Sequence, residues 1–584
     1  MLRRLVLCLF LLVWPVLGSA RDVATDVAPA PEAATGLTPK TLSVDDKHMV
    51  AAAHPLAAEA GREILRKGGS AVDAAIASQL VLGLVEPQSS GLGGGAFIVT
   101  FDAKEREVKT YDGRETAPAS ARPDRFLVNG RVMDFPDAVR SGLSVGVPGV
   151  LAAMELAHRQ HGKLPWAALF APAIAVSEAG FAMPVRLHQL LKLAGSDSFA
   201  PAARGYFFDA DGAPKPAGAI LKNPDYAATL KAVAANGARA FYEGAIADAI
   251  VAAVAGAPVA KGDLTHADLA AYQAKERPPL CFSYRAHKIC GMGPPSSGGL
   301  TVAQTLKLIE PFAEVQGADA AMQASALHVI AEAEKLAYAD RNRYIADPDF
   351  AVVPSGMLND GYLADRRKLI DPARAAEKPE AGLPPGVAQR TFGIDATHER
   401  AGTSHLSIID SDGNAVAMTT TIEGAFGSHL WAAGFLLNNE LTDFSLSPVD
   451  KNGNAAANAV AGGKRPRSSM SPTLIFDKDG ALQGVTGSPG GSKIILYVVK
   501  TLVAMLDWNM DAQQAAALMN FGSEGGAFCY EPDHAGVLQA IGLKSYGHML
   551  SGEMLTSGVH IVMRRNGRLE GGADPRREGV ALGD

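Results

Sequence analysis

The sequence predicts a layered α/β (α+β) fold, because helical patterns precede strands early in the chain and strands precede helices late in it. This order favours a sandwich of sheets and helices over a doubly wound parallel sheet. Of the 584 residues, 48% are hydrophobic, 20% are charged and 6% are aromatic. These values are close to average globular usage, which excludes a chain that is disordered throughout or collagen-like.

The expected elements follow from hydrophobic spacing and from the residues that end each run. Leu56, Ala60 and Ile64 recur at helical spacing before two glycines, whereas the later strands are short apolar runs between Gly, Asn and Asp turns. In chain order we expect helices over 54–68 and 71–84, strands over 96–101 and 107–111, a mostly helical region over 148–340, strands over 406–410, 415–421, 434–437, 474–476 and 482–485, and helices over 492–506 and 511–520.

The first 20 residues have the pattern of a secretory signal peptide. Arg3 and Arg4 precede an apolar run over 5–17, and Gly18-Ser19-Ala20 supplies small residues for cleavage. The run is shorter than the roughly 20 apolar residues that span a bilayer, and no later segment is long enough. We therefore expect an exported protein, periplasmic or secreted, with no membrane span. Residues 21–45 include an unpatterned Ala/Pro-rich stretch and are expected to form a disordered leader.

Charge and cysteine content exclude several classes of site. Lys and Arg total 54 against 61 Asp and Glu, and no basic run is interleaved with aromatic residues, which argues against nucleic-acid binding. The segment between Cys281 and Cys290 resembles a short hairpin, so these two residues either form a disulfide or remain buried thiols, and Cys529 has no obvious partner. No cysteine has zinc-site spacing and the chain has no HExxH or P-loop, so we expect no metal and no cofactor.

A hairpin over 403–421 is the most informative local pattern. If Ser411-Asp412-Gly413 is a three-residue loop, Asp410 pairs with Asn414 and Thr403 lies opposite Thr421. The two hydroxyls would then share a face, with Cβ atoms about 4.5 to 5.5 Å apart. A two-residue turn would shift the register by one, and a threonine that begins a strand is usually only a β-branched residue suited to a sheet.

Several motifs surround this hairpin in a fixed order. They are Gly402 before Thr403, then 438–444 (Asn-Asn-Glu-Leu-Thr-Asp-Phe), 466–472 (Pro-Arg-Ser-Ser-Met-Ser-Pro) and 487–491 (Gly-Ser-Pro-Gly-Gly), with 69–75, 90–95, 114–118, 144–149 and 294–299 upstream. At these residues the chain resembles the γ-glutamyltranspeptidases, a family of N-terminal-nucleophile hydrolases. The resemblance implies a four-layer αββα sandwich that cleaves itself between Gly402 and Thr403. It gives a large subunit, 46–402, and a small catalytic subunit, 403–584, that remain one intertwined fold.

The resemblance implies the catalytic roles. Thr403 would be the nucleophile, its freed α-amino group the base, and Thr421 the hydroxyl that orients it. An α-amino group has a pKa of about 7.7 to 8.0, so it can accept the hydroxyl proton near neutral pH, unlike a peptide nitrogen. The backbone N–H groups of Gly490 and Gly491 would form the oxyanion hole.

The resemblance also implies the substrate contacts. Arg114, Ser468 and Ser469 would bind the α-carboxylate of a γ-glutamyl donor, since a guanidinium suits a carboxylate. Glu440 and Asp443 would bind its α-ammonium. The acyl-enzyme would then react with water or with the amine of an amino acid or dipeptide.

The chain departs from the family pattern at three places. Glu423 stands where many members have Asn and would also bind the ammonium, and Thr442 stands where an acidic residue is common. The stretch 445–464 has no Tyr, Phe or Trp where several members carry an aromatic residue on a lid, which predicts a more open pocket.

Three functions follow as hypotheses. The first is an exported γ-glutamyltransferase and glutathione hydrolase acting on glutathione and related γ-glutamyl compounds. The second is a glutaryl or cephalosporin acylase of the same fold, and the third is an inactive exported binding protein. Gly91 to Ala96 match a dinucleotide fingerprint, but a strand follows where a helix should, so we expect no nucleotide site. His405 lies beside the nucleophile, yet we assign it no triad role because the N-terminal amine already supplies the base.

Overall fold

Two seven-stranded antiparallel sheets stack at the centre of the computed structural model, which describes residues 37–584 except 388–391, 396, 398 and 533–535. The first, called here the nucleophile sheet, has the strand order β23 (Val580–Gly583), β2 (Met49–Ala52), β12 (Thr403–Ile409), β13 (Ala415–Thr421), β3 (Gly95–Asp102), β4 (Glu107–Gly113) and β9 (Lys275–Arg277). Strands from the start, the middle and the end of the chain are therefore neighbours in one sheet.

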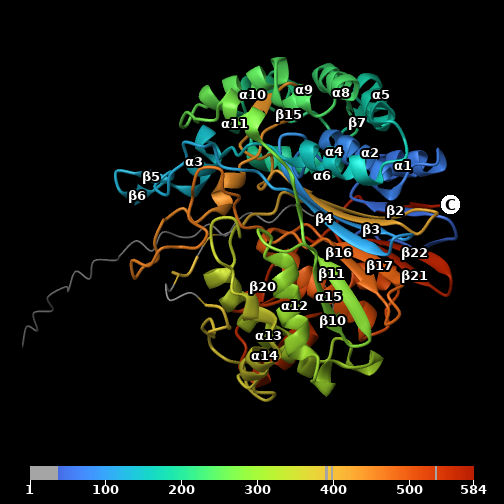
Figure 1. Ribbon diagram of the computed structural model, residues 1–584, viewed down its shortest axis with the longest axis vertical. Helices are drawn as coiled ribbons and strands as arrows, with labels where there is room; N and C mark the ends of the chain where they lie inside the picture. The colour runs from blue at the N-terminus through green and yellow to red at the C-terminus, as the bar shows by residue number, and fades with distance from the viewer. Residues whose placement is uncertain (1–36, 388–391, 396, 398, 533–535) are drawn as a thin grey trace, which may run out of the picture. The chain divides into compact units, whose positions relative to one another are not determined.

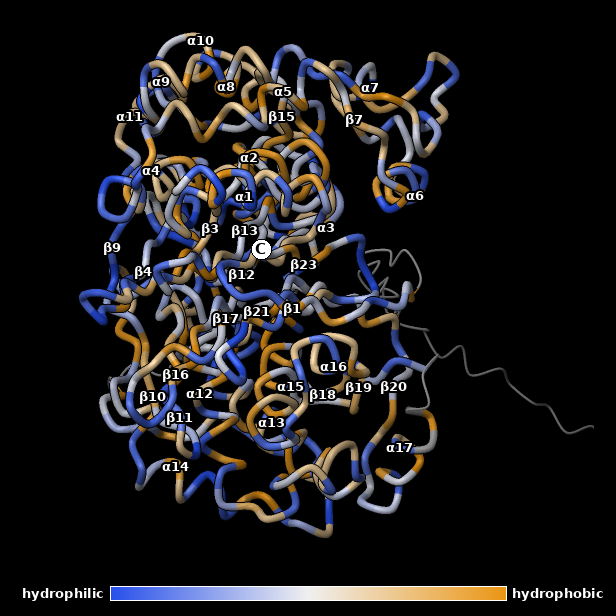
Figure 2. Tube along the Cα trace, turned by 90° about the vertical axis from the view of Figure 1, so that its right-hand side faces the viewer, coloured by the Kyte–Doolittle hydropathy of each residue, from blue (hydrophilic) through white to orange (hydrophobic). Residues whose placement is uncertain are grey.

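The second sheet combines the carboxyl-terminal strands with a hairpin from the middle of the chain. Its order is β1 (Ser43–Asp45), β22 (Arg568–Ala573), β21 (His560–Arg565), β17 (Leu482–Gly487), β16 (Thr473–Phe476), β11 (His287–Gly291) and β10 (Leu280–Tyr284). In both views β3 and β17 lie between α2 on one side and α15 on the other (Figure 1, Figure 2). Helix, sheet, sheet and helix thus form the αββα sandwich that the family resemblance implies.

Side chains on the nucleophile sheet alternate between two hydrophobic clusters. On β3, Ala96 and Ile98 join the cluster under the first helix layer, whereas Phe97 and Val99 join the cluster that includes the second sheet. This two-residue period is what a strand buried on both faces requires. Because both faces are covered by apolar contacts, the sheet holds its residues in a fixed register.

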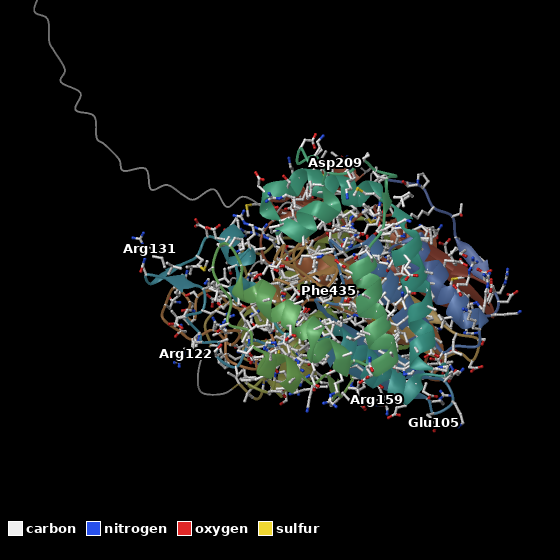
Figure 3. The ribbon with its side chains drawn as sticks, turned by 90° about the horizontal axis from the view of Figure 1, so that it is seen from above. Glu105, Arg122, Arg131, Arg159, Asp209 and Phe435 are labelled. Atoms are coloured by element: carbon white, nitrogen blue, oxygen red, sulfur yellow. A yellow bond between two sulfur atoms is a disulfide. The ribbon has the colours of Figure 1, made fainter. Side chains whose placement is uncertain are left out.

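Helices cover the outer faces of both sheets. The first layer includes α1 (Pro55–Arg66), α2 (Ala71–Val85), α4 (Val150–His161), α5 (Ala171–Ala179), α6 (Val185–Ala194), α8 (Pro224–Asn236) and α10 (Ala245–Ala255), and the second includes α12 (Gly298–Ile309), α13 (Ala324–Tyr344), α15 (Ile494–Leu506) and α16 (Ala512–Ala517). The Ser70 hydroxyl and the Asp73 carboxylate form a reciprocal capping box at the start of α2, which satisfies two amide donors. Arg122, Arg131 and Arg159 are exposed, whereas Phe435 is buried (Figure 3).

Most predicted elements are present within one to three residues of their expected ends. Helix α1 and α2 occupy the predicted positions, and β13 has the predicted bounds. The leader prediction was wrong at its end, because Ser43–Asp45 forms β1 and pairs with β22 at the sheet edge. The predicted signal peptide, residues 1–20, and residues 21–36 lie outside the described residues.

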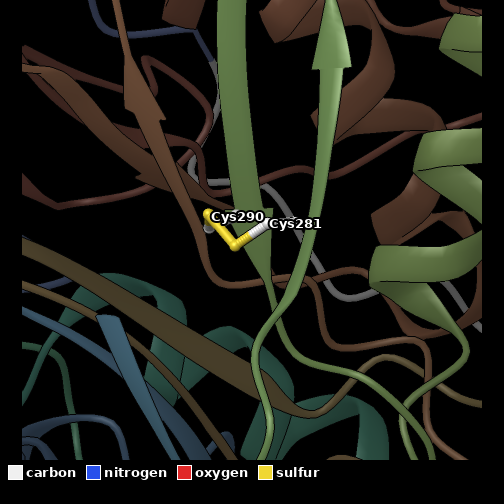
Figure 4. The surroundings of a disulfide bond; sticks show 2 residues. All are labelled: Cys281 and Cys290. Carbon is white, nitrogen blue, oxygen red and sulfur yellow. A yellow bond between two sulfur atoms is a disulfide. The ribbon is translucent and has the colours of Figure 1, made fainter. Parts of the chain in front are cut away.

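Cys281 and Cys290 face each other across the β10–β11 hairpin and are joined by a disulfide bond (Figure 4). Cys529 is a buried free thiol. Within the described residues, no helix is long and apolar enough to cross a membrane.

Candidate active site

The β12–β13 hairpin brings two threonine hydroxyls together in the predicted register. Thr403 pairs with Thr421, and the pairing continues without a shift to Ile409 and Ala415. Asp410 sets the turn, because its carboxylate accepts hydrogen bonds from the backbone N–H groups of Asp412 (3.0 Å) and Asn414 (2.9 Å). The register prediction is confirmed.

One hydroxyl connects the nucleophile candidate to the carbonyl before it. Thr403 Oγ1 donates to Thr421 Oγ1 at 3.2 Å, and Thr421 Oγ1 donates to the Gly402 carbonyl oxygen at 2.9 Å. The backbone N–H of Ile422 also points at that oxygen, at 3.4 Å, and the N–H of Glu423 donates to Thr421 Oγ1 at 2.8 Å. Two donors therefore converge on the Gly402 carbonyl, where negative charge would develop if the Thr403 hydroxyl attacked it.

The junction leaves no room for a side chain at position 402. A Cβ on Gly402 would lie 2.3 Å from the Glu423 carbonyl oxygen and 2.4 Å from the Gly424 carbonyl carbon. Glu423 itself has a φ of 77°, a conformation that non-glycine residues rarely adopt. The backbone around 421–424 is thus folded tightly against the Gly402–Thr403 bond.

A small pocket lies beside this bond. Its lining contains most of the residues that the sequence singled out, and Gly490 is absent from that lining although its neighbour Gly491 is present. The lining residues are Arg114, Glu399, Arg400, Thr403, Thr421, Glu423, Glu440, Asp443, Ser468, Ser469, Met470, Gly491 and Ile494. None of these described lining residues comes from 445–464. Gly491 has a φ of 60°, and a Cβ there would lie 2.7 Å from the Glu399 carbonyl oxygen.

Arg114 is bonded to Glu440 and Asp443, the two carboxylates that the sequence predicts to bind the α-ammonium of the substrate. Its guanidinium forms ion pairs with Glu440 and, at 2.6 Å, with Asp443. It also donates to the carbonyl oxygens of Pro466 (3.1 Å) and Arg467 (2.7 Å). Burial, followed by repulsion from nearby carboxylates, holds the pKa of Asp443 well above its usual range despite Arg114. The three groups thus compensate one another's charge in this structure.

Glu423 is held by backbone and amide donors. The N–H of Arg400 donates to one carboxylate oxygen at 2.8 Å, and the Asn439 side chain donates to the other. Burial raises the pKa of Glu423 even so. Thr442 does not line the pocket; its hydroxyl accepts from the Asn439 amide at 3.0 Å. Asn439 was missed by sequence reasoning, although it stands within the motif 438–444.

Ser469 joins a cluster that sequence reasoning also missed. Its hydroxyl accepts from Arg341 at 2.6 Å and donates to the carboxylate of Glu399, which also pairs with Arg341 and, at 3.4 Å, with Arg467. Burial alone would raise the pKa of Glu399, but the attraction of the two guanidinium groups lowers it below its usual range. By contrast, the Ser468 hydroxyl accepts from the N–H of Met470 at 3.1 Å.

His405 is buried and bonded away from the nucleophile candidate. Its ring nitrogens lie 2.8 Å from Thr419 Oγ1 and 3.0 Å from Ser407 Oγ. Burial lowers its pKa well below the usual value, which leaves it neutral. His405 is therefore held by hydrogen bonds within its own hairpin.

One buried group among the described residues has the composition of a metal site. The ligand atoms of His328, Glu332 and His548 lie within 4.8 Å of one another. However, the two imidazoles bond each other at 2.7 Å, and the ammonium of Lys335 bonds Glu332 at 2.8 Å. None of these three residues lines the pocket beside Thr403.

Sequence comparison supports a single family. The pattern of the family described as gamma-glutamyltranspeptidase matches residues 57–584. The chain is 35% identical to a glutathione hydrolase proenzyme of Bacillus subtilis over 563 residues, covering 93% of this chain and 92% of the relative. It is 36% identical to the glutathione hydrolase proenzyme of Escherichia coli, covering 90% of each. It is also 32% identical to the acylase ACY 1 proenzyme of Pseudomonas sp. strain V22, covering 95% and 96%.

Solved structures show the same fold. A cephalosporin acylase from Bacillus halodurans superposes with a TM-score of 0.82 at 27% identity, covering 94% of this chain and 98% of its own. A γ-glutamyltranspeptidase from Helicobacter pylori superposes with a TM-score of 0.53 at 32% identity, covering 60% of this chain and 98% of its own. With the hairpin, the pocket and the family pattern over 57–584, these findings establish that the chain belongs to the γ-glutamyltranspeptidase family.

Proposed function

We propose that this protein is an exported γ-glutamyltransferase and glutathione hydrolase that activates itself by cleavage between Gly402 and Thr403. The observation that carries the proposal is the bonded series of the Thr403 hydroxyl, the Thr421 hydroxyl and the Gly402 carbonyl, at 3.2 and 2.9 Å. In this series the Thr403 hydroxyl lies close to a carbonyl that already receives two donors, which supports its role as the nucleophile. The same pocket is lined by buried groups of both charges, which a γ-glutamyl group with its carboxylate and ammonium requires.

Self-cleavage begins with attack of Thr403 Oγ1 on the carbonyl carbon of Gly402. The oxyanion that forms is stabilised by the Thr421 hydroxyl and the Ile422 N–H. The C–N bond then breaks, the nitrogen of Thr403 takes up the proton that the hydroxyl has lost, and an ester remains. Hydrolysis of this ester by water leaves a carboxylate on Gly402 and restores the Thr403 hydroxyl beside its free amino terminus.

Turnover uses the new amino group as the base. It accepts the Thr403 hydroxyl proton while the oxygen attacks the γ-glutamyl carbonyl, because its pKa of about 7.7 to 8.0 suits neutral pH. Gly490 and Gly491 supply backbone N–H groups for the oxyanion, and the leaving amine departs with the proton. Water then completes hydrolysis, or an amino acid or dipeptide amine completes transfer.

Recognition of the donor divides between the charged groups of the pocket. Arg114, Ser468 and Ser469 bind the α-carboxylate, whereas Glu423, Glu440 and Asp443 bind the α-ammonium. Burial raises the pKa of both Glu423 and Asp443, so the charged form of each carboxylate is unfavourable there. A substrate ammonium that binds beside them would stabilise this charged form, which supports the assignment of these residues to the α-ammonium.

Denaturing electrophoresis with amino-terminal sequencing tests the first step. We expect two bands, the smaller beginning Thr-Ser-His-Leu-Ser, and a Thr403→Ala control that stays in one band. Release of glutamate from glutathione by the cleaved protein, and not by the control, then tests the activity. A single wild-type band after long incubation would refute the proposal and favour an inactive exported binding protein.

A second candidate function is a glutaryl or cephalosporin acylase. It is supported by the lack of Tyr, Phe or Trp in 445–464, where several family members carry an aromatic residue on a lid, and by the similarity to acylases. A glutaryl anilide lacks only the α-ammonium of a γ-glutamyl anilide. A kcat/KM for the glutaryl anilide above that for the γ-glutamyl anilide would establish the acylase, and the reverse would exclude it.

A further inference from the structure

A buried group of two histidines and one glutamate lies outside the lining of the candidate pocket. His328 and Glu332 stand four residues apart on α13, so both side chains project from the same face of that helix. His548 follows the short helix η9 (Lys544–Tyr546), 220 positions after His328 in the chain. The three side chains are buried, and their ligand atoms lie within 4.8 Å of one another. Imidazole and carboxylate groups are ligands that zinc accepts in proteins.

A hydrogen bond on the far side of His328 fixes which of its nitrogens faces the group. His328 Nε2 lies 2.8 Å from the carbonyl oxygen of Asp371, which can only accept, so Nε2 carries the hydrogen. The neutral ring therefore presents the lone pair of Nδ1 to the group. The ring of Tyr546 stacks on that of His328, with centroids 4.4 Å apart, and holds its plane. Metal-binding histidines are typically oriented in this way, by a backbone carbonyl on the other ring nitrogen.

The distances within the group are close to those that a tetrahedral zinc ion requires. Ligand atoms at about 2.0 to 2.2 Å from zinc lie about 3.3 to 3.6 Å from one another. His328 Nδ1 and His548 Nε2 are 2.7 Å apart, and His548 Nε2 is 4.0 Å from Glu332 Oε1. Each of these two separations has to change by less than about 1 Å to match that geometry.

Binding of the ion would move one hydrogen within His548. In the metal-free chain His548 Nε2 donates to His328 Nδ1, because that nitrogen carries only a lone pair. A zinc ion between the two nitrogens requires a lone pair on each, so the hydrogen leaves Nε2 and one is taken up at Nδ1 of the same ring. His548 Nδ1 is buried and has no hydrogen-bond partner among the described residues, so it can carry that hydrogen without losing a bond. Both imidazoles remain neutral, as metal ligands must be.

Lys335 competes with a metal ion for the carboxylate. Its ammonium bonds Glu332 Oε1, the oxygen that lies 4.0 Å from His548, at 2.8 Å, and the Ala376 carbonyl oxygen at 2.9 Å. The other carboxylate oxygen accepts from the N–H of Ala376 at 2.9 Å, which holds the carboxylate in place. A bound ion would displace the ammonium from Oε1 and leave it on the carbonyl oxygen. Removing the charge of Lys335 should therefore raise the affinity of the group for a cation.

We propose that His328 Nδ1, Glu332 Oε1 and His548 Nε2 bind one Zn²⁺ ion, with a water molecule as the fourth ligand. The ion connects α13 with the segment after η9. After the proposed cleavage between Gly402 and Thr403, two of the ligands belong to one fragment and His548 belongs to the other. The ion then joins the two fragments. This joining role rests on the proposed function, whereas zinc binding itself does not.

Zinc binding is measured by calorimetry on protein that has been treated with a chelator and dialysed. We expect one Zn²⁺ ion per wild-type chain and binding about a hundredfold weaker in His548→Ala, which removes one of three ligands. The matched control is His188→Ala, because its imidazole also bonds a backbone carbonyl, that of Lys215 at 2.9 Å, but lies outside the group. Lys335→Gln should bind zinc about tenfold more tightly than wild type, because no ammonium competes for Oε1.

The same variants distinguish a zinc site from a group that only stabilises the fold. Such a group would gain no affinity for zinc from Lys335→Gln, so zinc binding that is absent or unchanged in this variant refutes the site. Equal zinc affinity in His548→Ala and wild type refutes it as well. If His548→Ala does not accumulate, Glu332→Gln takes its place, because it keeps the shape of the side chain and loses the charge.

The uncleaved chain separates zinc binding from the proposed function. Thr403→Ala should bind zinc as wild type does, and a wild-type chain that binds zinc but never cleaves would support the site and refute the proposed function. Cleavage without zinc binding would have the opposite meaning. In cleaved wild type, one equivalent of zinc should raise the urea concentration at which the two fragments separate, with no rise in His548→Ala. No rise in wild type would overturn the joining role.

Discussion

Replacing Thr421 by valine removes one hydroxyl and almost nothing else. The two side chains have nearly the same shape, and Thr421 is 2% exposed, so packing is retained. The Gly402 carbonyl oxygen loses its 2.9 Å donor and, within the described part of the chain, keeps only the Ile422 N–H at 3.4 Å. Loss of one such donor typically slows a reaction about 10²- to 10³-fold, or roughly 3 to 4 kcal/mol. The N–H of Glu423 also loses its acceptor, which costs about 1 to 3 kcal/mol of stability.

The assay follows the uncleaved chain by denaturing electrophoresis after purification, with the fraction cleaved fitted to a first-order rate. Thr421→Ser is the control, because it keeps the hydroxyl and should cleave within about tenfold of wild type. A thermal unfolding scan shows that each variant is folded. Cleavage of Thr421→Val at the wild-type rate would refute the reasoning, and so would a serine variant as slow as valine.

Three further predictions concern the junction, the disulfide and acid stability. Gly402→Ala should block cleavage and lower the unfolding temperature, because its Cβ would lie 2.3 Å from the Glu423 carbonyl oxygen; an alanine variant that cleaves normally would contradict this. Replacing Cys281 and Cys290 together by serine should cost about 2 to 3 kcal/mol of stability, measured by thermal or urea unfolding. The value of kcat/KM should not change, because neither cysteine lines the pocket. Loss of activity without loss of stability would contradict this prediction. Burial lowers the pKa of His560 from 6.5 to about 3, so the unfolded state binds a proton below pH 6.5 that the native state does not. The free energy of unfolding should therefore fall as pH falls toward 3, by roughly 3 kcal/mol between pH 6.5 and 4 for this one group. In His560→Gln, the free energy from urea unfolding should depend less steeply on pH over that range. The same pH dependence in wild type and variant would contradict the prediction.

Local patterns were enough to predict the hairpin that holds the nucleophile candidate. The turn depends on Asp410 and on Gly413, whose φ is 85°, and both lie inside the 19 residues from Thr403 to Thr421. Because pairing across a short loop is set by the loop, the sequence alone specifies that Thr403 faces Thr421. The order of the surrounding motifs likewise predicted the family and its αββα sandwich.

Local sequence patterns could not predict the contacts between segments that are far apart in the chain. Strands β21, β22 and β23 follow residue 520, beyond the last element that the pattern predicted, and β1 was taken as part of a leader. An edge strand of three residues has too short a pattern to recognise, and it is stable only because β22 offers a partner.

The tertiary structure alone determines which charged side chains pair in the pocket. The sequence placed the candidate residues in motifs, and it assigned Arg114 to one charge of the substrate and Glu440 and Asp443 to the other. Only the fold brings Arg114 against two carboxylates 326 and 329 positions away, and sets Glu399 between Ser469 and Arg341. A motif specifies which charged side chain stands at a position. The partner of that side chain depends on which distant segments the two sheets bring next to it, because a buried charge must pair with a group that lies within contact distance.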